Sequence, residues 1–113
     1  MLMSKAEALI YMCGILEERW FLTQDDEVGR LNGDVFPGGR KGREILHTKD
    51  PAAWSDWEQA VKKITNEVMI TEIQAKLAMI ELMKEYNKQG FHLQETIDHF
   101  QHVLIQPNER WLD

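Results

Sequence analysis

The sequence predicts an all-α domain, an irregular bundle of four main helices and one short helix. Apolar residues recur at intervals of three and four along most of the chain. Two Ser/Thr-x-x-Glu/Gln sequences and one Asp-Pro sequence mark the starts of three helices. No alternation of apolar and polar residues is long enough to indicate a sheet. At 113 residues the chain is expected to form one domain, residues 1–113.

The first helix is expected to begin after Ser4 and to end near Phe21 or Leu22. The Ser4 hydroxyl and the Glu7 carboxylate can each accept a hydrogen bond from the other's backbone amide, as in a capping box. The apolar side of this helix comprises Ala8, Leu9, Met12, Cys13, Ile15, Leu16 and Trp20.

A short helix is expected from about Asp26 to Leu31, ended by a turn at Asn32-Gly33. Acidic residues at its start are favoured by the positive end of the helix dipole. Residues 34–48 lack an apolar period and are expected to form a flexible, exposed basic loop. The glycines of this loop lack the Lys-Ser/Thr of a phosphate-binding loop, so a solvated loop or a partner contact is the better interpretation.

The next helix is expected from Asp50 to about Asn66 and supplies the central wall of the core. Asp50 can cap it, and Pro51 suits its first position because the missing N–H is not needed there. Trp54 and Trp57 begin an apolar stripe with a large buried area. That stripe continues through Val61 and Ile64.

A second capping box, Thr71 with Gln74, starts a helix that ends at Gln89-Gly90, with Phe91 packing back on it. A last helix is expected from about Leu93 to Ile105. It is followed by a tail, residues 107–113, in which Trp111 is expected to fold back on the core rather than remain an exposed anchor.

The two capping-box helices match when the chain is shifted by 67 positions. The cap, the following small residue and later apolar residues recur in register, either by duplication or by convergence on a common amphipathic pattern. The aligned pairs are Ser4 with Thr71, Glu7 with Gln74, Ala8 with Ala75, Met12 with Met79, Ile15 with Leu82, Leu16 with Met83 and Glu18 with Glu85.

Composition favours a protein partner over nucleic acid. The formal net charge is −6, with 19 acidic and 13 basic residues, which opposes phosphate binding and suits a basic protein. The single cysteine, Cys13, excludes an internal disulfide and fits a reducing compartment. No apolar run is long enough for a membrane span and no signal peptide is recognised, so we expect a cytoplasmic location and no membrane contact.

No residue pattern indicates catalysis or a cofactor. No nucleophile is placed beside a base, so we expect a protein that is not an enzyme. The last segment carries His92, Glu95, His99 and His102, of which His99 and His102 are spaced to share an ion. One helix supplies few zinc ligands in good geometry, however, and a solvated or partner-contacting face is the simpler interpretation.

Part of the chain resembles small bacterial immunity proteins of polymorphic toxin systems, including contact-dependent inhibition. The resemblance covers about residues 4–65 and is carried by the acidic segment 23–29 and by the Trp54–Trp57 helix with its Asp50-Pro51 start. It implies a protein that binds and neutralises a cognate toxin domain. The basic residues 38–43 and the histidine-bearing last helix depart from that family pattern.

If the toxin domain is basic, the contact surface should be acidic, which selects the exposed carboxylates of the first helix and the following turn. These are Glu17, Glu18, Asp25, Asp26 and Glu27. Secondary contacts are expected from Arg40, Lys41, Arg43, His99 and His102. The alternative is a non-enzymatic interaction or regulatory module, such as a phage-encoded factor or a dimerising adaptor.

Overall fold

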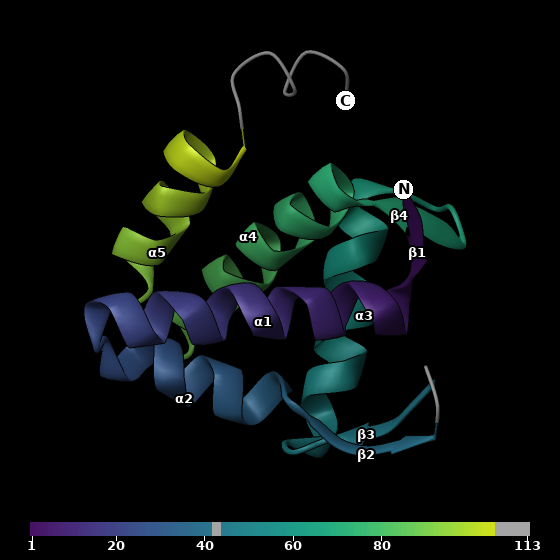
Figure 1. Cartoon of the computed structure of the whole chain (residues 1–113), viewed down its shortest axis with the longest axis horizontal. Helices are drawn as coiled ribbons and strands as arrows, with labels where there is room; N and C mark the ends of the chain where they lie inside the picture. Colours follow the sequence, from purple (N-terminus) through teal and green to yellow (C-terminus); the bar gives the residue numbers. More distant parts are fainter. Residues whose placement is uncertain (42–43, 106–113) are drawn as a thin grey trace.

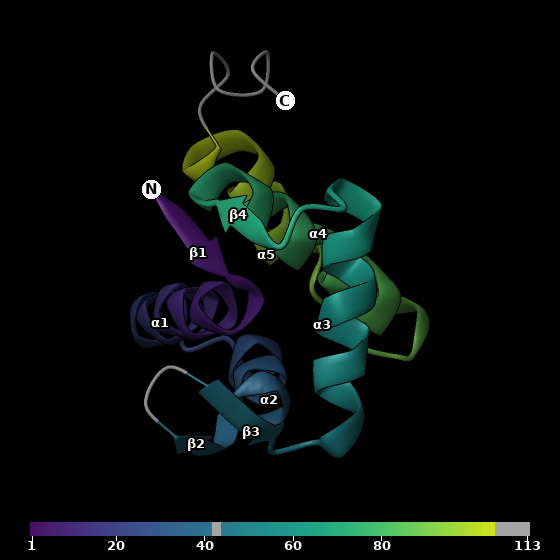
Figure 2. The ribbon, with the colours of Figure 1, turned by 90° about the vertical axis from the view of Figure 1, so that its right-hand side faces the viewer.

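The computed structural model describes residues 1–41 and 44–105 and confirms a mostly α-helical fold (Figure 1). In chain order the elements are β1 (Leu2–Ser4), α1 (Lys5–Thr23), α2 (Asp26–Val35), β2 (Pro37–Lys41), β3 (Glu44–Thr48), α3 (Pro51–Ile64), β4 (Met69–Thr71), α4 (Glu72–Lys88), α5 (Gln94–His99) and the π-helical segment η1 (Phe100–Leu104). Helix α2 runs back alongside α1, and α4 and α5 lie on the other side of α1. Helix α3 packs across α4 at one flank of the bundle (Figure 2).

The predicted caps form as the sequence indicates. The Ser4 hydroxyl accepts from Glu7 N at 3.1 Å, and Thr71 accepts from Gln74 N at 3.1 Å, each within a complete capping box. Asp50 caps α3 by accepting from Ala52 N at 3.0 Å, ahead of Pro51 in the first turn. Local side chains therefore fix where three of the long helices begin.

Each capping-box helix is preceded by a short strand, so the chain contains two equivalent strand–helix units. Strands β1 and β4, which precede α1 and α4, pair antiparallel with Met3 opposite Ile70. Met3 and Ile70 are also equivalent under the shift of 67, so the ladder has a local two-fold axis at this pair. The three-residue strands are too short to show an alternation in the sequence, and for this reason they were not predicted.

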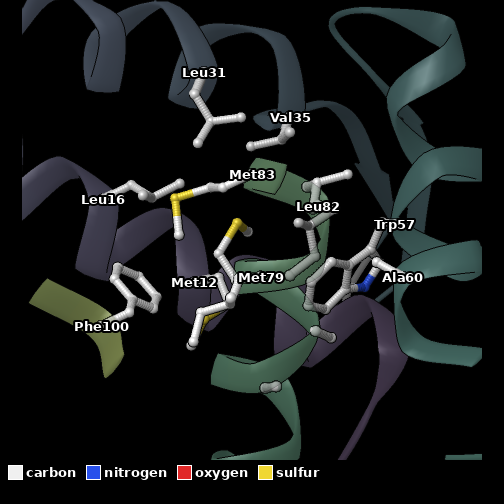
Figure 3. Close-up of a cluster of buried hydrophobic side chains, with 14 of the residues drawn as sticks. Met12, Leu16, Leu31, Val35, Trp57, Ala60, Met79, Leu82, Met83 and Phe100 are labelled. Atoms are coloured by element: carbon white, nitrogen blue, oxygen red, sulfur yellow. The ribbon is translucent and has the colours of Figure 1, made fainter. Parts of the chain in front are cut away.

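One hydrophobic core joins the long helices (Figure 3). Met12 and Met79 are fully buried in it, as are Leu16 and Met83, so residues equivalent in the two units share the same interior. Trp57 is fully buried, and its indole N–H donates to the Lys5 carbonyl at 2.9 Å. The central role predicted for Trp57 is confirmed, whereas Trp54 is only partly buried at the edge of the core.

The prediction of a loop at residues 34–48 is wrong. Helix α2 continues through Asn32 and Gly33 to Val35, whose burial in the core favours the additional turn. Strands β2 and β3 then form an irregular antiparallel hairpin. Thr48 is fully buried at the end of the hairpin, and its hydroxyl bonds to the Asp50 carbonyl and accepts from Trp54 N, which joins the hairpin to the start of α3.

The last helix covers nearly the residues predicted for it, but its second half is π-helical. It begins at Gln94 and changes to π-helical spacing at Phe100, where Ile105 N bonds to the Phe100 carbonyl at 3.0 Å. The expected stop after α4 is present: Gly90 has a φ of 102°, and Phe91 packs against the Tyr86 ring at 5.1 Å. The predicted tail, residues 107–113 with Trp111, lies outside the described residues.

Candidate partner-binding groove

One face of α1 turns away from the core and forms a wall of a surface groove. Ile10, Gly14, Glu17 and Phe21 follow one another at intervals of three or four residues, so they lie in one stripe along the helix. The stripe rises by roughly 16 Å, at about 1.5 Å per residue. Helix α2 lies alongside α1 and supplies the opposite wall.

The main hollow of this groove has a volume of about 600 Å³ and an aromatic lining. Phe21 is 63% exposed and Phe36 is 41% exposed, although both are large apolar side chains. Trp20 contacts Phe21 edge-on, with ring centroids 5.3 Å apart. The complete lining is Glu17, Trp20, Phe21, Asp26, Gly29, Asn32, Gly33, Phe36 and Lys49. Exposed aromatic groups beside charged rims are typical of protein interfaces.

A second hollow of about 510 Å³ adjoins the first and shares Glu17 and Phe36 with it. It is lined by Ile10, Cys13 and Gly14 of α1 and by Pro37 and Gly38 at the start of β2. The two hollows together therefore follow the exposed stripe of α1 along most of its length. We call the pair of hollows the α1–α2 groove.

Two carboxylates lie on the rim of the α1–α2 groove, Glu17 where the two hollows meet and Asp26 at the start of α2. Neither carboxylate forms a hydrogen bond or ion pair with another residue in the described part of the chain. Lys49 lies at the other end of α2, where its amide bonds to the Phe36 carbonyl at 2.9 Å. A positive group would therefore be attracted to the Asp26 end of the groove.

Two polar groups on the groove lining lack partners within the described residues. The Oδ1 atom of Asn32 is buried without a hydrogen bond. The indole N–H of Trp20 has no acceptor in the same part of the chain, and the ring lies so close to Gly29 that a Cβ there would be 3.0 Å from it. Gly29 therefore has a fold-based reason to be glycine, because a side chain there would press on the Trp20 ring.

The five predicted acidic residues do not form one cluster. Glu17 and Asp26 line the α1–α2 groove, whereas Asp25 and Glu27 line a different hollow of about 580 Å³ with His92 and Glu95. Glu18 is exposed and lines neither hollow. The acidic turn is therefore divided between two surfaces.

Asp25 and Glu27 also accept hydrogen bonds through their side chains, whereas Asp26 accepts none from the described residues. Asp25 caps α2 by accepting from Glu27 N at 3.0 Å. Glu27 accepts from His92 N at 3.0 Å and lies 3.8 Å from the Arg30 guanidinium, which stacks on Phe91 at 3.8 Å. Glu27 thus fastens the segment before α5 to α2, so its replacement would affect stability as well as any binding.

The histidines contact different parts of the molecule. His92 precedes α5 beside Glu27, and His102 lies in a hollow beside α4. His99 is partly buried near Arg19, and its pKa is lowered by burial and then by the Arg19 charge. Within residues 1–41 and 44–105 no three His, Cys, Asp or Glu side chains come together as a metal site.

The predicted basic contact residues belong to the hairpin. Arg40 and Lys41 are in β2, and Arg43 lies outside the described residues. Gly38 lies at the base of the hairpin, where an added Cβ would be 2.6 Å from the His47 ring. A side chain at position 38 would therefore require the exposed His47 ring to move.

The apolar residues of the groove were not predicted as site residues from the sequence. Trp20 was expected in the core, and it does pack against it, but Phe21, Phe36 and Gly33 were not selected. A signal was present in the sequence: Ile10, Gly14 and Phe21 form a second stripe on the side of α1 assigned to solvent. Phe36 could not be placed because it follows the wrongly predicted end of α2.

Comparison with known proteins adds no relative: no family model, curated protein or solved structure matches this chain. None of the helices formed by the described residues is both long and apolar enough to cross a membrane.

Proposed function

We propose that this chain is an immunity-type inhibitor, which binds a basic toxin domain and neutralises it by protein–protein contact rather than by catalysis. The single observation that carries this proposal is a pair of exposed carboxylates, Glu17 and Asp26, which have no partner among the described residues and lie on the rim of a groove lined by Trp20, Phe21 and Phe36. Aromatic groups supply contact area, while complementary rim charge raises the association rate and selects the partner.

The charge of the whole chain supports the same partner. A net charge of −6 attracts a basic domain such as a nuclease before contact is made. The buried thiol of Cys13 is compatible with action in the cytoplasm, where a toxin delivered into the cell would be met. The resemblance of residues 4–65 to immunity proteins agrees with this proposal.

Co-expression with the product of the gene directly upstream tests the function. If that product is a toxin, the parent chain should restore growth and should bind the purified toxin domain. A non-toxic upstream product, or a toxin that neither binds nor is neutralised, would instead favour the alternative, an interaction or regulatory module with another partner.

A further inference from the structure

Two glycines on the α1–α2 groove have no explanation in the described part of the fold. Gly14 lies in the middle of α1 and Gly33 lies within α2. Neither has a positive φ, since Gly90 is the only glycine of the described residues that does. A Cβ added at either position would meet no described atom within 4 Å. Glycine inside a helix is unfavourable relative to alanine, so both positions carry a cost without a visible benefit.

Both unexplained glycines face the same groove. Gly33 lines the main hollow and Gly14 lines the adjoining one, on opposite walls. Gly29, by contrast, is explained by the Trp20 ring that lies against it. The unexplained glycines are therefore those at which a bound partner could approach the helix backbone.

We infer that the α1–α2 groove receives an α-helix of the toxin domain, with its basic residues over Glu17 and Asp26. This inference rests on the proposed function and specifies how the partner is bound. Charge complementarity favours Lys or Arg side chains of the partner over Glu17 and Asp26, because both carboxylates are exposed. Lys49 lines the same hollow and would repel a helix that is basic along its whole length.

The dimensions of the groove favour a helix over a single inserted side chain. The exposed stripe from Ile10 to Phe21 is roughly 16 Å long, which corresponds to about three helical turns. Small residues at a contact let helix axes approach to the lower end of the usual range of about 8–10 Å. An apolar side chain of the partner would then rest on Trp20 and Phe36, and a donor beside Asn32 could satisfy its Oδ1 atom.

Gly33→Leu is the decisive variant, since a Cβ there meets no described atom within 4 Å and the rest of the side chain extends into the groove. The dissociation constant of the purified upstream toxin domain should rise at least ~10-fold, because the partner helix can no longer approach α2. Ser55→Leu adds the same side chain to an exposed position of α3 and should leave the dissociation constant unchanged. Gly33→Ala should raise the melting temperature by about 2–5 °C, which shows that glycine is not required for folding.

Hydrogen exchange on the toxin domain identifies the occupant. Binding of the parent chain should protect a helical segment that carries Lys or Arg, and Gly33→Leu should abolish that protection. If the parent binds and Gly33→Leu binds equally well, or if the protected segment is a strand or loop, the inference is overturned and the proposed function stands. If the parent itself neither binds nor protects growth, the proposed function fails and the inference fails with it.

Discussion

The indole Nε1 of Trp57 donates a 2.9 Å hydrogen bond to the backbone carbonyl of Lys5, the first residue of α1. This bond joins the centre of α3 to the start of the first capping-box helix, close to the paired strands β1 and β4. Trp57 is fully buried, so one side chain supplies both apolar packing and the hydrogen bond. The two strand–helix units and α3 are therefore held together around it.

Trp57→Ala should lower the free energy of unfolding by ~3–5 kcal/mol, because it leaves a large cavity. Trp54→Ala should cost less, since Trp54 is only partly buried. Urea denaturation of both variants measures the difference. A loss below ~1 kcal/mol for Trp57→Ala would show that Trp57 does not anchor the core.

Glu27→Ala should destabilise the protein by roughly 1–2 kcal/mol, because the His92 amide loses a charged acceptor. Asp26→Ala is the matched control and should change stability by no more than about 0.5 kcal/mol. Thermal or urea unfolding checks both values. Equal losses at the two positions would contradict the division of the acidic turn into structural and binding residues.

His99→Gln should reduce the loss of folding stability that accompanies a fall in pH. The pKa of His99 is lowered in the folded state by burial and by Arg19, so below pH ~6.5 the unfolded chain binds more protons at this site. The stability that neutral His99 provides is present above that pH and is lost as the pH falls through the folded-state pKa. Urea midpoints between pH 5 and pH 7.5 measure it, and parallel curves for parent and variant would contradict the assignment.

Cys13 should react with iodoacetamide only when the chain unfolds. Burial, with a smaller effect from Glu17, raises the pKa of the thiol to about 12. Compared with an ordinary thiol, the thiolate fraction at pH 8 is reduced roughly a thousandfold. Mass spectrometry should show at least ~100-fold slower alkylation in buffer than in concentrated urea. Similar rates would mean that the thiol is accessible from the hollow beside Ile10.

Features set by local chemistry could be predicted from the sequence. The starts of α1, α3 and α4 depend on Ser4, Asp50 and Thr71, whose side chains bond within the next three residues. The match at a shift of 67 likewise indicated two equivalent helices. Their spatial relation, with Met3 opposite Ile70, could not be predicted because strand pairing of three residues leaves almost no local pattern.

Features set by tertiary contacts were missed. Nothing near Asn32-Gly33 signals that α2 continues, because the burial of Val35 against the core favours the additional turn. Strand β2 is glycine-rich, its pairing with β3 is irregular, and Thr48 at the end of β3 fastens the pair to α3. The carboxylates of the α1–α2 groove were predicted by charge, but its aromatic lining depends on the position of Phe36 after that extended helix.

The most direct test of the central claim is the association rate of the toxin domain with the double variant Glu17→Lys/Asp26→Lys. The structure favours this pair over Asp26 with Glu27, because Glu27 also holds the His92 segment. Glu67→Lys, an exposed change beyond α3 near β4, is the control for charge reversal away from the groove, with half the change in net charge. The double variant should associate at least ~10-fold more slowly and lose growth protection, with only a modest fall in melting temperature from the lysine at the start of α2.

The same rates should be measured at ~0.1 M and ~1 M salt, where the Debye length falls from about 10 Å to about 3 Å. The difference between parent and double variant should shrink at high salt, because the rim charges act on the approaching partner. Equal association rates for parent and double variant at low salt, with full growth protection, would contradict the assignment of the acidic groove as the toxin-binding surface.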